Sequence, residues 1–204
     1  MPRKPAYDRE IVLEKALKMF WADGYRCVDV DALTRTVGLN RHSLYGAFGG
    51  KKGLFHQSLN RYADTIAGQF VVGLGTGTGL SAIVTYFSNA TKRLGADRQA
   101  GTPADGCFIA NTIIELGRAD QAVNAIIDRF YSRIEQAFGD AVRRGQGDGT
   151  IRADLDPANT AQWLIATSQG MSVGARFGRA TCGLLPALEA SLAAPSRRQP
   201  RNSV

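Results

Sequence analysis

The sequence predicts an all-α protein of about nine helices, with a small N-terminal helix-turn-helix domain followed by a larger helical domain. Apolar residues recur at spacings of three and four along most of the chain, as on one face of an α-helix. No segment has the alternation of apolar and polar residues that is typical of a strand. Residues suited to capping helices separate the periodic segments, and they place short helices first and long helices later.

Three short helices are expected in the first fifty residues. Asp8, Asp29 and Asn40 can each accept hydrogen bonds from the free backbone N–H groups at a helix start. The first helix is expected to end near Gly24. The next two are expected to meet across a turn at Gly38, because glycine adopts positive φ at no steric cost. Their common apolar centre is formed by Leu33, Val37, Leu39, Leu44 and Phe48.

This pattern is typical of a helix-turn-helix and predicts that the protein reads duplex DNA. The helix opened by Asn40 would be the recognition helix, with Arg41, His42, Ser43 and Tyr45 facing outward. Residues 1–61 hold 11 Lys/Arg against 6 Asp/Glu, whereas residues 62–194 hold 11 against 12. A basic face attracts phosphate groups. A merely soluble basic surface would have the same charge, so the coincidence of charge and motif is what favours DNA.

A long helix is expected from Lys51 to about Val72, because its apolar stripe meets no turn signal before Gly73. This helix would start at the DNA-binding domain and end deep in the next one. The glycine-rich run 73–79 follows a helix and lacks the Lys-Ser/Thr ending of a phosphate loop, so it is interpreted as a connection. Further helices are expected at about 80–94, at 106–117, from Asp120 to the glycines near 145, after the Asp156-Pro157 cap, and at 184–193.

The segment 106–117 is nearly all apolar and predicts a helix buried in the core. The expected domains are therefore residues 1–50 for DNA binding, residues 51–194 for ligand binding and dimerisation, and a disordered basic tail at 195–204.

Several functional classes are not favoured by the sequence. No apolar run approaches the roughly 18 residues that span a bilayer, and no signal peptide is evident, so a cytoplasmic protein is expected. The three cysteines are too few and too far apart for a disulfide framework. No Cys/His spacing matches a metal site, and we expect no cofactor and no catalytic residues.

Thirteen residues between 20 and 55 agree in register with a known family. They are Phe20, Gly24, Tyr25, Leu33, Gly38, Leu39, Ser43, Leu44, Tyr45, Phe48, Lys51, Leu54 and Phe55. On these residues, segment 10–60 resembles the N-terminal domain of the TetR/AcrR transcriptional regulators. Three residues, Ala47, Gly50 and Lys52, depart from the family pattern. These departures affect the expected phosphate contacts but not the expected fold.

The resemblance implies a homodimer whose recognition helices enter successive major grooves of a palindromic operator, with a small-molecule-binding domain behind them. It most favours a repressor that the effector releases from DNA. Arg41 and His42 would reach base edges from the start of the recognition helix, beside Asn40 and Ser43. Tyr45 and Lys51 would contact phosphate, and Arg3 and Lys4 could form a basic arm along the backbone.

The family analogy also implies an effector pocket among the central helices. Its candidate lining consists of Tyr86, Phe87, Phe108, Asn111, Phe130, Trp163 and Gln169. Asn111 and Gln169 are the more informative, because an amide on an apolar helix face must find a partner or lose free energy. They could equally bridge neighbouring helices.

Cys107 opens a Gly-Cys-apolar-apolar-x-Asn pattern that resembles some TetR-like repressors, including electrophile sensors. A thiolate at a helix N-terminus is stabilised by backbone N–H groups, so Cys107 is a candidate ligand-site or redox-sensing residue. The alternative is that it packs as a small hydrophobe. A small enzyme with Cys107 as nucleophile is a more remote alternative, because both histidines, His42 and His56, belong to the DNA-binding part.

Gly170, Gly174 and Gly178 are expected on one face of the helix that follows Asp156. Together with Leu188 of the last helix they would form the dimer interface, although close packing within one chain would also need them. A DNA-compacting protein without a ligand is the remaining alternative, and it would leave the second domain without a role.

Overall fold

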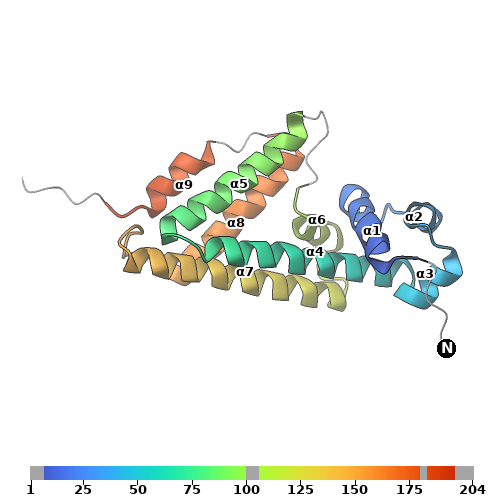
Figure 1. Ribbon diagram of the computed structural model, residues 1–204. Coiled ribbons are helices and arrows are strands. Elements are labelled where there is room, and N and C mark those ends of the chain that lie inside the picture. The colour runs from blue at the N-terminus through green and yellow to red at the C-terminus, as the bar shows by residue number, and fades with distance from the viewer. Residues whose placement is uncertain (1–6, 100–105, 180–182, 196–204) are drawn as a thin grey trace, which may run out of the picture.

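The structure, a computed structural model, describes residues 7–99, 106–179 and 183–195. These residues form nine α-helices in an elongated arrangement with the N-terminal domain at one end (Figure 1). Among them the only strand-like feature is a bridge between Ile151 and Ala193, so the expected all-α fold is confirmed. The expected basic arm at Arg3 and Lys4 lies outside the described residues. Cys182 and all but the first residue of the 195–204 tail lie outside them as well.

The N-terminal domain begins its helices at the residues expected from the sequence. Its helices are α1 (Arg9–Asp23), α2 (Val30–Val37) and α3 (Arg41–Phe48). Asp8, Asp29 and Asn40 accept backbone N–H groups at 2.8, 2.8 and 2.7 Å, which satisfies donors that the helix itself cannot. Gly38 closes α2 with a left-handed φ of 75°. The three helices enclose Leu33, Leu44 and Phe48, which are all buried.

The second domain is built around two long helices, α4 and α7, that run side by side (Figure 1). Its helices are α4 (Gly50–Leu74), α5 (Gly79–Gln99), α6 (Phe108–Leu116), α7 (Gln121–Gly147), α8 (Pro157–Arg176) and α9 (Leu184–Leu192). Helices α5 and α8 pack on α7, and α9 packs on α5. As expected, α4 continues without a break from the DNA-binding domain into the second domain. No helix in the described part of the chain is long and apolar enough to cross a membrane.

The glycine-rich run that ends at Gly79 allows the start of α5 to pack closely against α7. A Cβ at Gly79 would stand 2.2 Å from the carbonyl oxygen of Ala141 and from the backbone nitrogen of Gly145 in α7. Only glycine permits this approach. The backbone N–H of Gly79 also donates to Asp148 at 3.0 Å, which fixes the start of α5 at the end of α7.

Two helices differ from the sequence-based expectation. Helix α6 is buried on one face only. Phe108 and Thr112 are buried, whereas Ile114 is 72% exposed. The reason is that α6 lies at the junction of the two domains, with only one face packed. Helix α8 ends at Arg176, so Gly178, with φ of 79°, lies beyond it and not on its glycine face.

Candidate DNA-binding face and sensor pocket

Helix α3 presents its polar side chains to solvent. His42 is exposed and Ser43 is half-buried. Tyr45 is 61% exposed, so it is not part of the apolar core. Its ring lies over the backbone of Gly50, where a Cβ would stand 2.8 Å from the ring. The tight packing holds the phenol on the same face as the N-terminal end of α3.

Arg41 is held by a carboxylate of the neighbouring helix. Its Nε and one terminal nitrogen each donate to Asp31 of α2 at 2.8 Å. This hydrogen bonding raises the pKa of Arg41, and the charge of Asp31 acts in the same direction. Both side chains are more than half exposed, so the pair contributes little to stability. It orients the guanidinium on the exposed side of α3.

Lys51, at the start of α4, points over an aromatic ring. Its Nζ lies 4.6 Å from the ring centroid of Tyr25, which is a cation–π distance. The contact places a cation next to α3 and restricts its side chain. Lys51 thus lies near the N-terminus of α4, and its expected contact with a phosphate stays a prediction.

Two carboxylates connect the DNA-binding domain and α4 to the rest of the second domain. Asp120, the N-cap of α7, lies 3.0 Å from His56 Nε2 and 3.0 Å from Lys52 Nζ of α4. Burial opposes ionisation of Asp120, but the hydrogen bonds from Lys52 and His56 outweigh it and lower its pKa well below the usual range. Glu115 of α6 accepts the backbone N–H groups of Tyr25 and Arg26 at 2.9 and 2.5 Å.

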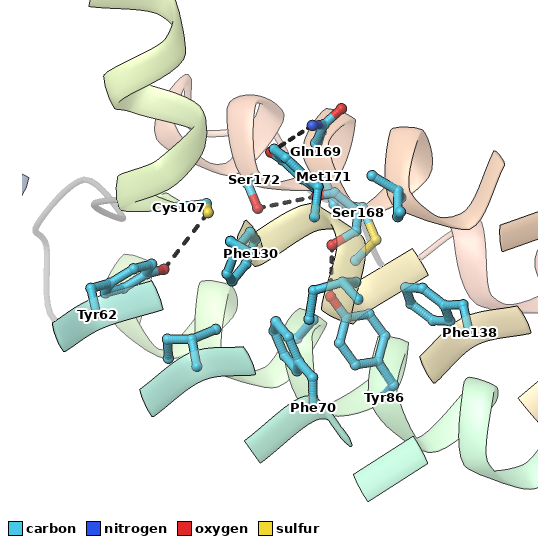
Figure 2. A pocket seen from close by; sticks show the side chains of 15 residues that line it. Tyr62, Phe70, Tyr86, Cys107, Phe130, Phe138, Ser168, Gln169, Met171 and Ser172 are labelled. Carbon is cyan, nitrogen blue, oxygen red and sulfur yellow. Dashed lines mark hydrogen bonds between the residues drawn. The ribbon is translucent and has the colours of Figure 1, made fainter. Parts of the chain in front are cut away.

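A small cavity lies among α4, α5, α7, α8 and the start of α6 (Figure 2). Its volume is about 40 Å³, which is room for about one water molecule. Apolar side chains form most of the wall. The lining residues are Tyr62, Ile66, Phe70, Tyr86, Ala90, Cys107, Phe130, Tyr131, Ile134, Phe138, Ile165, Ser168, Gln169, Met171 and Ser172.

The polar groups in this wall are paired with one another. The Tyr62 hydroxyl donates to Cys107 Sγ at 3.7 Å (Figure 2). Tyr86 and Ser168 share a hydrogen bond of 2.8 Å between their hydroxyl oxygens. Gln169 donates its amide to the Tyr131 hydroxyl at 2.6 Å. Burial raises the pKa of Tyr131 to about 12, so this phenol is neutral at physiological pH.

Comparison with known proteins agrees with this arrangement of a helix-turn-helix and a helical pocket domain. The family model described as "Bacterial regulatory proteins, tetR family" matches residues 12–57. The model described as "Tetracyclin repressor-like, C-terminal domain" matches residues 80–184. The chain belongs to the TetR family. It is thus a DNA-binding transcriptional regulator, as the motif predicted.

Among TetR-family relatives, the transcriptional repressor ComR of Escherichia coli is 29% identical over 178 residues, covering 86% of this chain and 83% of ComR. The reduced form of E. coli NemR superposes with a TM-score of 0.82 at 18% identity, over 93% of this chain and 98% of NemR. A cysteine mutant of the TetR-family regulator CifR, bound to a 26-base-pair operator, superposes with a TM-score of 0.77 at 27% identity, over 93% and 97% of the two chains.

The structure brings together only some of the side chains expected to form the TetR-type pocket. Tyr86, Cys107, Phe130 and Gln169 line the cavity. Phe87 is buried behind Tyr86, and its ring stacks on Phe138. Phe108 and Asn111 line a different cleft, which faces the DNA-binding domain. Trp163 points away from the cavity and is 42% exposed on the outer side of α8.

Tyr62, Tyr131 and Ser168 also line the cavity, although the sequence pattern does not indicate them. Tyr62 belongs to the apolar stripe of α4, where an aromatic residue is usually ordinary core. Tyr131 directly follows Phe130, and helical periodicity alone does not decide which of two adjacent aromatics faces inward. Ser168 gave no signal, because its partner Tyr86 is 82 residues away in sequence.

The outer side of α8 carries an apolar stripe. Trp163, Val173 and Phe177 are 42%, 47% and 84% exposed, and a Cβ on Gly170 would meet open space. Leu188, which we expected at the dimer interface, is 3% exposed, and so its side chain is already covered within its own chain. The outward apolar surface in this region therefore comes mainly from α8.

Proposed function

We propose that this protein is a repressor that binds a palindromic operator as a homodimer and is released by a small-molecule effector bound in the cavity among α4–α8. The observation that carries the proposal is the continuity of α4. Lys51, which we assign to a phosphate contact, lies at its start, and Ile66 and Phe70 farther along the same helix line the cavity. A change in the cavity that moves α4 must move the DNA-binding domain.

Operator reading is assigned to α3. His42, Ser43 and Arg41 lie on its first turn, from which side chains reach base edges in the major groove. Tyr45 and Lys51 are assigned to phosphate contacts, and Asn40 to positioning the helix through its cap on Ser43. The repressor ComR and the operator complex of CifR support this role.

Dimerisation is assigned to the outer side of α8. A second copy of the chain would bury the apolar stripe that includes Trp163, Val173 and Phe177, which is favourable. Gly170 would let the two α8 helices approach closely. A two-fold dimer would place the two α3 helices on successive major grooves, roughly 34 Å apart.

We expect the effector to be a mostly apolar molecule with one or two hydrogen-bonding groups. At about 40 Å³ the cavity must open to admit it. A groove of about 260 Å³ between α4 and α5 shares Phe70, Tyr86 and Ala90 with the cavity wall, so rotation of Phe70 and Tyr86 would join the two spaces. The opening breaks the Tyr86–Ser168 hydrogen bond, which the effector's own polar group can replace.

The proposal is tested by selecting operator sequences from random duplexes and measuring their binding at several salt concentrations. We expect a palindromic site. In a plot of the logarithm of the binding constant against the logarithm of the salt concentration, the slope should be about −0.9 for each phosphate that the protein neutralises. A thermal-shift screen with the same protein then identifies effectors, and these should release the operator. Sequence-independent binding, or a screen hit that leaves operator affinity unchanged, would contradict the proposal.

A second candidate is a thiol sensor, in which modification of Cys107 replaces effector binding. It is supported by the position of Cys107 in the cavity wall, within hydrogen-bond reach of Tyr62. Cys107 should then react with maleimide faster than the exposed Cys27. Cys107→Ser should keep operator binding and lose only the response to the reagent. Faster labelling of Cys27, or an unchanged response in Cys107→Ser, would exclude this candidate.

A further inference from the structure

A second and larger cavity lies between α6 and the DNA-binding domain. One wall comes from the end of α1 and the loop after it, and the other comes from α6 and the end of α8. Its lining residues are Phe20, Trp21, Asp23, Gly24, Arg26, Cys27, Phe108, Asn111, Thr112, Ile114, Glu115 and Arg176. Its volume of about 420 Å³ is within the range of roughly 300–1,000 Å³ typical of small-molecule sites.

This interdomain cleft contains an anion-binding nest that is occupied by a side chain of the protein itself. The carboxylate of Glu115 accepts the two successive backbone N–H groups of Tyr25 and Arg26. Gly24, with φ of 82°, makes room for it, because a Cβ there would stand 2.9 Å from Glu115 Oε2. Successive backbone N–H groups that point at one site favour an anion. The nest therefore selects a carboxylate.

A buried hydroxyl in the same wall has no partner. Thr112 lies one turn before Glu115 on α6 and is 1% exposed. Within the described part of the chain its Oγ1 makes no hydrogen bond. A buried hydroxyl without a partner costs free energy, which an incoming acceptor would recover.

We propose that the interdomain cleft binds a small planar organic carboxylate that displaces Glu115 from the nest. The ligand's carboxylate takes the N–H groups of Tyr25 and Arg26, and Thr112 donates a hydrogen bond to the ligand. The apolar ring of the ligand lies along Trp21 and Phe108. The rings of these two residues stack on each other with an angle of 28° between their planes. This site is separate from the cavity among α4–α8, because Thr112 and Glu115 do not line that cavity.

Occupation of the cleft removes the hydrogen bonds of Glu115 between α6 and the DNA-binding domain. The Glu115 hydrogen bonds join α6 directly to the loop that precedes α2. Without these hydrogen bonds, the DNA-binding domain is joined to the second domain mainly through α4. Ligand binding in the cleft therefore changes operator affinity even when the α4–α8 cavity is empty.

The experiment uses benzoate as the probe and benzamide as its uncharged match. The chain has two tryptophans, so a ¹H–¹⁵N spectrum of the full-length protein holds two indole signals. Benzoate should shift the Trp21 signal and leave that of Trp163, on the outside of α8, unchanged. Benzamide should shift neither at the same concentration. No benzoate response, or an equal response to benzamide, would overturn the proposal.

Three variants separate this cleft from any other benzoate site. Thr112→Val should weaken benzoate binding about tenfold, the effect of losing one hydrogen bond to a charged group. It should not lower the melting temperature, because it removes a hydroxyl without a partner. Glu115→Gln should strengthen benzoate binding, since the competing carboxylate is gone. Glu14→Gln, an exposed carboxylate on α1, is the control and should bind as the wild type does. Unchanged binding in both cleft variants would overturn the proposal.

Discussion

At the scale of single residues, Arg41 has one observed partner and one proposed partner. In the free protein its guanidinium pairs with Asp31. On the operator the same donors would face a base edge, and arginine to guanine is the commonest specific contact in the major groove. Asp31 thus keeps Arg41 oriented between encounters, and an exposed pair of this kind costs little to exchange.

This double role gives a prediction on specificity. Arg41→Ala should cost on the order of 1–3 kcal/mol on the preferred operator and little on substituted ones. Lys51→Ala should instead weaken all sequences by similar factors, because it removes a phosphate contact. Fluorescence anisotropy with the selected operator and single-base variants measures both, with Lys18→Ala on α1 as a surface control. Equal loss of discrimination in the Arg41 and Lys51 variants would contradict these roles.

Asp120 gives a prediction on stability and pH. Its folded pKa is lowered by Lys52 and His56, so the charged carboxylate stabilises the folded state at any pH above its unfolded value of about 3.9. That contribution is lost as pH falls from about 4 toward the lower folded value. Asp120→Asn keeps an N-cap side chain but loses the charge, so it should cost about 1–2 kcal/mol at pH 7 and flatten the pH dependence below 4.

Urea unfolding at several pH values measures this effect. Asp120→Ala, which also removes the cap on Ala122, should be less stable than Asp120→Asn by about 1 kcal/mol. If Asp120→Asn unfolds with the same pH dependence as the wild type, Lys52 and His56 do not lower the pKa of Asp120 in the folded protein.

At the scale of helices, the sequence predicts where elements begin better than which face they bury. Caps such as Asp8, Asn40 and Asp120 are local, because one side chain and the next backbone N–H groups decide them. Burial is decided by partners distant in sequence. Ile114 and Trp163 look like core residues in the sequence, and their exposure follows from the junction and from the outer side of α8.

The same limit explains the candidate sites. The recognition helix was predictable because its geometry is contained in one motif of about twenty residues. The cavity was predicted only in part, because Tyr86 meets Ser168 across 82 residues. The role of Glu115 does not follow from its apolar segment, because its backbone partners are about 90 residues earlier.

The outer side of α8 gives a prediction on assembly. Val173→Asp places a charge in the apolar stripe, so it should convert the proposed dimer to a monomer in sedimentation experiments. Operator affinity should then fall by two orders of magnitude or more, because two linked half-site contacts become one. Val72→Asp is the control, since Val72 is the same residue type on α4 and is 70% exposed, against 47% for Val173. A Val173→Asp protein that remains a dimer would place the interface elsewhere.

At the scale of the whole molecule, α4 runs continuously between the two proposed sites, and we expect it to couple them. An effector that favours one spacing of the two DNA-binding domains can shift the equilibrium only by its difference in affinity for the two states. By linkage, operator DNA must weaken effector binding by the same factor that the effector weakens operator binding, typically 5- to 150-fold. Titrating an effector from the thermal-shift screen against the free and the operator-bound protein should give this difference. The Val173→Asp monomer should bind effector with the free protein's affinity, because its cavity is intact. Equal effector affinities for free and operator-bound dimer would mean that the movement of α4 does not carry the signal.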